Sequence, residues 1–496
     1  MLPSELLQPL DTLLTSGCDR RLVRCASGFN PYGTGVDVRS ALPLGSCTCS
    51  SPSARAIVAA QAALKTLRES SCPHAVAAKL LVGVRSILRH RLKLSVDVAI
   101  ALTPSGTDVE ILALALVGGN DDRKIVNVVV GAGEVGSGTI RAAGGLHSDQ
   151  IVPRGKASVV GHAVNESLAA RTTVVPISVR SGSGEILSPI EIDDRVSQAV
   201  IDAVSQGSRV LVHLVAHSKT GVHAPTLGLI QRLTKAMGND VSVVVDAAQA
   251  RLAPSAYQSA LDRGLMVFLT GSKFFGGPPF AGALLIPPAL RPNNFSGLDG
   301  LENYLGREDF PVTWERVRSS CDEWLNVGSL LRWVAAASEI DAYFRVPDHV
   351  RKRIAVAFNQ AIQERFMGLS NVKLVRSFQS VDHGSYLRPI ESTPTVFAVE
   401  MMDQRGHRLG RDSLKELHGQ LNVTGEDRFH LGQPVAIGRD RYALRIALGA
   451  PLVTQIANGT NDDSTLQHRI AKFQNQLGTL SQRMTELSRS TLEVGS

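Results

Sequence analysis

Cysteine is scarce in this chain. Its six cysteines among 496 residues are Cys18, Cys25, Cys47, Cys49, Cys72 and Cys321. This number and spacing fit neither a disulfide framework nor a paired zinc ribbon, so we expect reduced thiols. Cys47 and Cys49 form a C-x-C pair that would suit a metal. No His/Cys cluster accompanies the pair, so we favour small structural residues and predict no metal site.

Long apolar runs are also lacking. No uninterrupted apolar stretch reaches the roughly 18 residues that span a bilayer. The first 14 residues carry Glu5 and Asp11 and lack the basic region and apolar stretch of a secretory signal. We therefore expect a cytoplasmic protein without a membrane partner. The net charge of +7 comes from scattered Lys and Arg residues rather than from a basic run interleaved with aromatics, which argues against a nucleic-acid partner.

Short β-branched runs that alternate with helical stretches make up much of the chain. The clearest strands are 96–102, 125–130, 173–179, 209–216, 241–245, 265–269 and 282–286. This alternation predicts an α/β fold with a mostly parallel, seven-stranded sheet covered by helices. Ligands of such sheets bind beyond the carboxyl ends of the strands, so polar residues there are candidates for a site.

The pattern changes after Pro311. Two helices are expected over 327–344 and 347–366, followed by strands at 395–400 and 442–448, which indicates a smaller α+β domain. We predict an N-terminal arm with a covering loop (1–75), a large domain (76–310), a small domain (311–460) and an amphipathic C-terminal helix (461–496). This last helix carries one apolar stripe, and we favour docking on its own domain over pairing between subunits. The stripe consists of Leu466, Ile470, Phe473, Leu477, Leu480, Met484 and Leu487.

Two predicted strands end in polar groups. One leads into Asp246-Ala-Ala-Gln249, and the other leads into Thr270-Gly-Ser272-Lys273. A carboxylate at a buried strand end needs a cationic partner, and a Lys in an apolar, glycine-rich turn tends to be neutralised by desolvation or by reaction. A cofactor that is an aldehyde with a basic ring nitrogen meets both needs. Lys273 would form the imine, and Asp246 would keep the ring nitrogen protonated. An Asp and a Lys that only pair or cap turns remain the alternative.

A third strand ends in the turn Ser105-Gly106-Thr107, ahead of a helix expected over 109–117. Backbone N–H groups at the start of a helix form an anion site, and small residues let a phosphate approach. The Thr107 hydroxyl would add a bond. A plain helix cap explains the same residues.

These motifs together resemble the fold-type I pyridoxal-phosphate (PLP) enzymes, in particular the class V aminotransferase and cysteine desulfurase group. The shared pattern is Asp-x-x-Gln at a strand end and, about two dozen residues later, a small-polar, Gly, polar, Lys turn. The resemblance implies that Lys273 carries PLP as a Schiff base and that Asp246 and Gln249 face the ring nitrogen and the phenolic oxygen. Thr270 and Ser272 would contact the phosphate, together with the turn of Ser105, Gly106 and Thr107.

The resemblance extends to other segments. His217 and Ser218 occupy the position of the loop near the cofactor oxygen, although a strand-end His is often only a polar cap. Arg445 stands on the strand whose arginine holds the substrate carboxylate in many of these enzymes, and a guanidinium binds a carboxylate bidentately. Asn30 and Tyr32 lie in a segment that looks like the loop covering such sites. The resemblance also implies a homodimer.

One loop supports a rival interpretation. Gly131-Ala-Gly133-Glu134-Val135-Gly136 follows a strand as G-x-G-x-x-G, the fingerprint of an NAD(P)-binding oxidoreductase. The acidic residue expected about 20 residues further on is missing. In the PLP interpretation the same loop lines the cofactor, with Val135 where the family usually stacks an aromatic or His on the ring. His147 would substitute only if the loop is longer.

The resemblance implies an enzyme of amino acid metabolism, but the residues do not decide its reaction. Transamination of an amino acid is the plainest interpretation. A lyase or a beta/gamma-substitution enzyme acting on a C–C or C–S bond stays close behind because of Val135, and a noncatalytic binding protein is a third alternative. Desulfurase chemistry is disfavoured because the only cysteine after Lys273 is Cys321, about fifty residues on, in a segment (316–324) expected to be helical.

Overall fold

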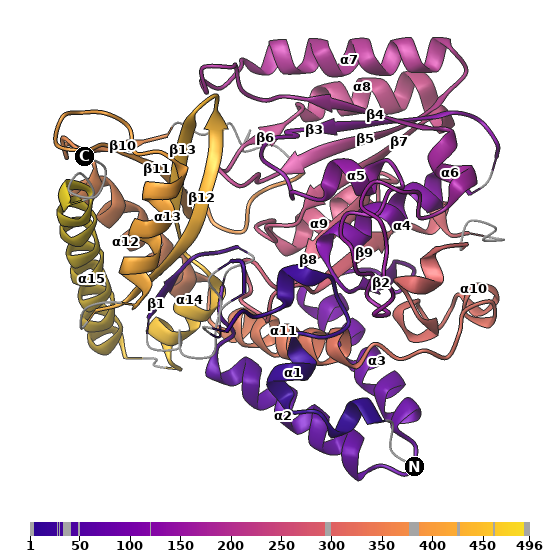
Figure 1. The fold of residues 1–496 in the computed structure, drawn as a ribbon, viewed down its shortest axis with the longest axis horizontal. Coiled ribbons are helices and arrows are strands. Elements are labelled where there is room, and N and C mark those ends of the chain that lie inside the picture. The colour runs from indigo at the N-terminus through magenta and orange to yellow at the C-terminus, as the bar shows by residue number, and fades with distance from the viewer. Residues whose placement is uncertain are drawn as a thin grey trace.

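The computed structural model describes residues 4–26, 28, 30–32, 41–47, 50–119, 121–292, 299–375, 386–423, 427–459 and 462–490. Two sheets organise these residues. The larger sheet lies in the upper right of Figure 1 and the smaller one on the left, while the helices of the N-terminal part lie below both.

The larger sheet has the strand order β2-β9-β8-β7-β5-β3-β4 within the described residues. Pairing is parallel except for β9, which is antiparallel to both neighbours. This confirms the predicted mostly parallel, seven-stranded sheet, and a short strand, β6 (His223–Ala224), pairs in addition with the end of β5. The strands are β2 (Ala99–Thr103), β3 (Ile125–Val130), β4 (Thr172–Ile177), β5 (Arg209–Ala216), β7 (Val241–Ala247), β8 (Met266–Thr270) and β9 (Gly282–Ile286).

Helices cover both faces of the large sheet. The apolar helix α4 (Gly106–Gly118) packs on one face, against side chains such as Leu211 and Val244. On the other face lie α7 (Pro189–Ser205), α8 (Leu227–Met237) and α9 (Pro254–Leu261), packed against the intervening residues of the same strands. A sheet covered on both sides buries its strands completely, which explains why they are nearly continuous runs of Val, Leu and Ala. The short helices α5 (Thr139–Ala143) and α6 (Glu166–Ala170) complete the α4 face.

The smaller sheet has the order β1-β12-β13-β11-β10. Its strands are β10 (Val372–Leu374), β11 (Val396–Met401), β12 (Phe429–Gly438), β13 (Arg441–Ala447) and β1 (Leu42–Leu44). The predicted strands at 395–400 and 442–448 correspond to β11 and β13, each shifted by one residue. The sequence did not predict β12, nor the pairing of β1, from the N-terminal part of the chain, in parallel with β12.

Long helices connect the two sheets. Helix α11 (Val327–Arg345) packs against α2 (Ala54–Glu69), α3 (Pro73–Arg91) and α1 (Leu10–Leu14). The domain boundary predicted after residue 75 falls within α3, so a division there would cut a helix. Helix α10 (Glu315–Ser319) is shorter than the helical segment expected over 316–324 and ends before Cys321.

The C-terminal helix α15 (Asp463–Ser490) lies on its own small domain. It packs against α12 (Asp348–Phe366), α13 (Arg411–Val423) and α14 (Ala450–Ala457). The predicted apolar stripe is buried from Leu466 to Met484, and Leu487 is partly buried. This confirms the favoured docking. In the part of the chain that the structure describes, no helix combines the length and the apolar character needed to cross a membrane.

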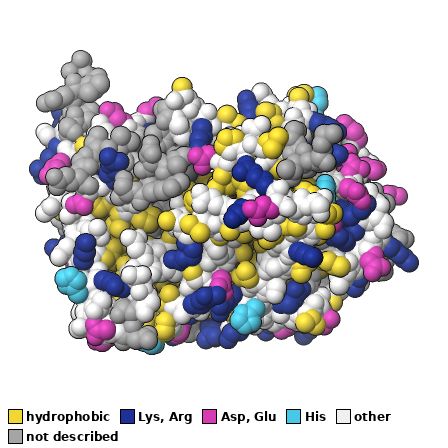
Figure 2. Space-filling view, turned by 90° about the horizontal axis from the view of Figure 1, so that it is seen from below, with side chains coloured by type: hydrophobic (Ala, Val, Ile, Leu, Met, Phe, Trp, Pro, Cys, Tyr) yellow, Lys and Arg dark blue, Asp and Glu magenta, His cyan; other side chains and the backbone are white. Residues whose placement is uncertain are grey.

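The face seen from below carries Lys and Arg side chains spread among acidic and apolar ones, without one continuous basic patch (Figure 2). Apolar side chains are exposed on the elements that lie at the bottom of Figure 1, among them Leu7, Val58 on α2 and Val82 on α3. The homodimer implied by the resemblance stays a prediction, which light scattering on the purified protein tests.

The docking of α15 leads to a prediction on stability. Leu480 is fully buried, so Leu480→Ala removes apolar contacts and leaves a cavity. We expect the free energy of unfolding to fall by about 2–5 kcal/mol. Glu486→Ala, on the exposed side of the same helix, is the control and should change it by less than about 0.5 kcal/mol. Urea unfolding measures both. Equal stabilities for the two variants would mean that α15 does not dock as described.

Candidate active site

A cavity lies beyond the carboxyl ends of β5, β7 and β8, beside the start of α4. It brings together ten residues predicted from the sequence: Gly106, Thr107, Val135, His217, Ser218, Asp246, Gln249, Thr270, Ser272 and Lys273. Residues that the sequence did not single out complete the wall, among them Arg21, Glu110, Glu134, Lys219, Phe268 and Phe280. Segments more than 150 residues apart in the sequence therefore share one site.

Asp246 and Lys273 face this cavity from neighbouring strands. Asp246 is the penultimate residue of β7, pairs in register with Phe268 of β8, and accepts a hydrogen bond from the N–H of Ala248 (3.0 Å). Burial raises the pKa of Asp246, and the charge of Lys273 opposes this shift. Burial lowers the pKa of the Lys273 amine, with Asp246 raising it and the positive charge of Arg445 lowering it. A lysine held in this way is more readily deprotonated, which suits a nucleophilic amine.

Gln249, Thr270 and Ser272 stand around this pair. Gln249 and Ser272 are buried and line the cavity. The Thr270 hydroxyl donates to the carbonyl oxygen of Ala248 (2.6 Å), so in this structure it ties the end of β8 to the loop after β7. Its donor is thus already used, and a contact with a phosphate would require the hydroxyl to rotate.

The start of α4 is the predicted phosphate turn, and it is capped by its own chain. Ser105 is the N-cap: its hydroxyl accepts from the N–H groups of Thr107 (3.1 Å) and Asp108 (3.3 Å). Ser105 therefore lies behind the turn and is not among the residues that line the cavity, in contrast to the prediction for it. A Cβ on Gly106 would lie 3.2 Å from the Thr270 methyl, which is tighter than an ordinary van der Waals contact, so glycine is favoured at this position. The helix is one turn longer than predicted because Ser105 caps it.

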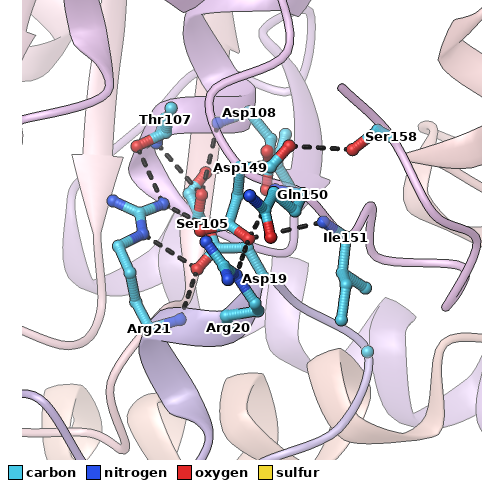
Figure 3. A network of polar contacts seen from close by, with 12 residues as sticks. Asp19, Arg20, Arg21, Ser105, Thr107, Asp108, Asp149, Gln150, Ile151 and Ser158 are labelled. Atoms are coloured by element: carbon cyan, nitrogen blue, oxygen red, sulfur yellow. Dashed lines mark hydrogen bonds and ion pairs between the residues drawn. The ribbon is translucent and has the colours of Figure 1, made fainter. Parts of the chain in front are cut away.

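Arg21 from the N-terminal part reaches the same turn (Figure 3). Its guanidinium pairs with the Asp19 carboxylate, donates to the Thr107 hydroxyl (3.2 Å) and lies 4.6 Å from the centre of the Phe280 ring. The adjacent Arg20 pairs with Asp149 (2.9 Å), which further anchors this segment. The structure thus adds a cation to the predicted phosphate turn.

The G-x-G-x-x-G loop does not have the geometry of a dinucleotide fingerprint. The next helix, α5, has five residues and begins at Thr139, three residues after the last glycine. Instead, the loop places Glu134 in a buried network. The Glu134 carboxylate pairs with the Arg180 guanidinium and accepts hydrogen bonds from the hydroxyls of Ser218 and Thr220. The rival interpretation as an NAD(P) enzyme therefore loses its main support.

Val135 lines the cavity, as predicted, with an aliphatic side chain in the place where an aromatic was expected. His147 does not replace it, because its ring stacks on Tyr304 and its Nδ1 lies 2.6 Å from the Tyr304 hydroxyl. His217 does reach the cavity. It has a φ of +61°, and its Nδ1 lies 3.0 Å from Nε2 of His223. The second histidine holds the ring of His217 in place.

The predicted substrate-binding residues lie at the margin of the site. Arg445 on β13 is buried and near enough to Lys273 for its charge to lower the lysine pKa, but it is not among the residues that line the cavity. Tyr32 packs on Phe280, which does line it (ring centres 6.2 Å apart). The side chain of Asn30 accepts from the N–H of Tyr32 (2.9 Å), so its observed role is to shape the covering segment.

Four charged residues at the site were missed in the sequence: Arg21, Glu110, Glu134 and Lys219. Lys219 directly follows Ser218 at a strand end, which is a signal that would have found it. Glu134 lay inside a motif interpreted through its glycines alone. Arg21 belongs to a segment without a motif, so only the fold shows that it reaches the cavity. Of the cysteines, Cys321 donates to Val317 in the α10 region, and Cys49 lies outside the described residues.

Comparison with known proteins supports the fold. No protein-family profile matches the chain, and no curated protein matches its sequence. Solved structures do share its architecture. A complex of the cystine C–S lyase C-DES with its reaction product cysteine persulfide is 15% identical; the match covers 85% of this chain and 94% of the other, with a TM-score of 0.51.

Two further structures are similar. A C-DES mutant with glycine covalently linked to the PLP cofactor is 15% identical, with 91% of this chain and 99% of the other covered and a TM-score of 0.52. Mouse CSAD is 13% identical, with 91% and 84% covered and a TM-score of 0.54. The chain therefore has the fold of the fold-type I PLP-dependent enzymes, as the resemblance implied.

The buried Glu134 network gives a second prediction. Glu134→Gln keeps the shape of the side chain but leaves the Arg180 charge buried without its counterion. We expect the free energy of unfolding to fall by about 3–5 kcal/mol in urea unfolding. The double variant Glu134→Gln, Arg180→Met removes both charges and should recover part of this loss. A double variant with the summed loss of the two single variants would contradict a direct pair.

A third prediction concerns pH. Burial, with the negative charge of Asp19, raises the pKa of Asp108 from its usual 3.8 to about 7. The folded protein thus holds this proton more tightly than the unfolded chain. The resulting stabilisation is complete below about pH 4 and is lost as the pH rises through 7. Asp108→Asn stays neutral, so between pH 5 and 8 the variant should gain about 1–4 kcal/mol relative to the wild type. Parallel stability profiles in urea unfolding would contradict this assignment.

Proposed function

We propose that this protein is a PLP-dependent enzyme that acts on an amino acid, with Lys273 as the residue bonded to the cofactor. The observation that carries the proposal is the convergence of Lys273, Asp246 and Gln249 on one cavity whose far end is the glycine turn at the start of α4. A lysine amine, a buried carboxylate and an anion site in one cavity match an aldehyde, a ring nitrogen and a phosphate on one cofactor.

The described residues fit such a group. The Asp246 carboxylate would accept the ring N–H, since burial beside a cation is the setting in which a carboxylate stabilises a protonated nitrogen. Gln249 would donate to the phenolic oxygen, whereas the Ser218 hydroxyl already donates to the Glu134 carboxylate. Gly106 would bind the phosphate through its backbone N–H and Thr107 through its hydroxyl, because the Thr107 N–H already donates to Ser105. Ser272 and the Arg21 guanidinium would lie beside them.

PLP, when bound, supplies an electron sink that stabilises negative charge at the substrate's alpha carbon. The chain's own residues would position the substrate and move protons. Lys273, whose amine has a lowered pKa, would take and return the proton at the alpha carbon. Arg445 would bind the substrate carboxylate, and the segment with Tyr32 packed on Phe280 would exclude water from one side.

Transamination is our first proposal for the reaction, because it requires only proton transfer by Lys273 and a bound carboxylate. A C–S or C–C lyase is the second candidate. Two observations favour it: the aliphatic Val135 stands where a stacking ring was expected, and the fold is similar to that of a cystine C–S lyase. Persulfide chemistry on the protein is not proposed, because Cys321 is not among the residues that line the cavity.

The cofactor assignment is tested by adding PLP to the purified protein and reducing it with borohydride. We expect a pyridoxyl group on the peptide that contains Lys273, found by mass spectrometry, and no label in Lys273→Ala. Lys235→Ala, which removes an exposed lysine on α8, is the control and should be labelled like the wild type. Labelling of Lys273→Ala at the wild-type level, or none in the wild type, would refute the proposal.

The two reaction types differ in their products. A transaminase converts an amino acid to its oxo acid and leaves the amino group on the cofactor as pyridoxamine phosphate. A lyase instead releases a side-chain fragment and regenerates the cofactor unchanged. Chromatography of the cofactor after incubation with single amino acids, together with analysis of the released products, therefore distinguishes them.

A further inference from the structure

Lys219 occupies an unusual position in the turn between β5 and β6. Its N–H donates to the carbonyl oxygen of Glu134 (3.1 Å). The residues on either side, Ser218 and Thr220, both donate to the Glu134 carboxylate, which is itself paired with Arg180. Three consecutive residues, 218 to 220, are therefore fixed to Glu134, and this holds the backbone of Lys219 in place. The side chain of Lys219 lines the cavity that also contains Lys273.

Most charged side chains that line the cavity have an opposite charge nearby or are disfavoured in their charged form. Arg21 pairs with Asp19, Glu134 pairs with Arg180, and Asp246 faces Lys273. Burial raises the pKa of Glu110 well above its usual range, which favours the neutral form of this carboxyl. Among the described residues, the Lys219 ammonium forms neither a hydrogen bond nor an ion pair within ordinary distance. Lys219 is thus attracted by the charges of Glu134 and Asp246 but forms no ion pair with either.

A second cation lies near Lys219. Burial lowers the pKa of Lys219 to about 8, and the positive charges of Arg445 and Lys273 contribute to this shift. Arg445, the residue proposed to bind the substrate carboxylate, therefore acts on Lys219 through its charge. Two cations close together repel each other and are stabilised by an anion that lies between them or bridges them. A substrate with two anionic groups supplies one for each cation.

We propose that Lys219 is a specificity-determining residue that binds a second acidic group on the substrate. The substrate class is an amino acid whose side chain ends in a carboxylate, sulfonate or phosphate. Arg445 would hold the alpha carboxylate and Lys219 the side-chain anion. This inference rests on the proposed function, since it presumes an amino acid bound over the cofactor.

The experiment compares matched amino acids that differ in one charge. The pairs are aspartate with asparagine, glutamate with glutamine, and O-phosphoserine with serine. Dissociation constants are measured in the PLP-loaded protein from the change in cofactor absorbance. In the wild type, at least one acidic member should bind about 10- to 100-fold more tightly than its neutral partner, as expected for one charge-assisted hydrogen bond.

Three variants show whether Lys219 causes the preference. Lys219→Met should abolish it while binding of the neutral partner changes less than about threefold, and Lys219→Arg should retain most of it. Lys235→Met removes a charge from the exposed side of α8 and should behave as the wild type. Retention of cofactor by each variant is measured first. The proposal is overturned if Lys219→Met keeps the acidic preference. It is also overturned if the wild type shows no such preference or binds none of the six probes.

A second readout does not require turnover. Acetylation of Lys219 by acetic anhydride, followed by mass spectrometry, should increase with pH about a midpoint near 8 and should decrease when the preferred acidic amino acid is present. Unchanged acetylation in its presence contradicts the inference.

A protein that retains PLP on Lys273 but shows no acidic preference refutes this inference alone, whereas a protein that does not bind PLP refutes the proposed function as well. Loss of turnover in Lys219→Met with an unchanged acidic preference would assign Lys219 to proton transfer instead, and would likewise overturn the proposal.

Discussion

The register of the parallel strands β5, β7 and β8 is the constraint on which the site depends. Val215, Asp246 and Phe268 lie beside one another in adjacent strands, so the residues that follow each strand meet at one edge of the sheet. A shift of one residue would turn Asp246 to the opposite face, away from the cavity. The covering helices on both sides oppose such a shift, because each buried residue of these strands packs against a helix.

Burial of charge is the second organising principle. Ionised groups inside a protein are costly unless they are paired, and the pairs at this site join distant parts of the chain. Glu134 and Arg180 connect the loop after β3 with the segment after β4, and their network holds the turn after β5. Arg21, which pairs with Asp19, likewise fastens the N-terminal part to α4, because its guanidinium donates to the Thr107 hydroxyl. Lys219 differs from these residues because it forms no ion pair with a described residue, although the charges of Glu134 and Asp246 attract it.

Much of the fold could be predicted from local patterns. The strands β3, β5 and β9 have the predicted bounds, because short apolar runs between polar turns are distinctive. β12 was missed because it contains Gly432 and Pro434 and its pairing with β13 shifts register, all of which weaken a strand pattern. β1 has three residues and is a strand only because β12 lies beside it. The stripe of α15 was recognised because its period repeats over several turns.

The sequence by itself determined the residues that share one strand end: Asp246 with Gln249, Thr270 with Lys273, and the glycine turn before α4. Their spacing is local, so it remains visible without the fold. Only the tertiary structure decided which charges meet, because electrostatic pairing depends on distance in space and on shared burial. It added Arg21 to the phosphate turn, moved Ser105 behind it as a helix cap, and placed Lys219 in the same cavity as Lys273.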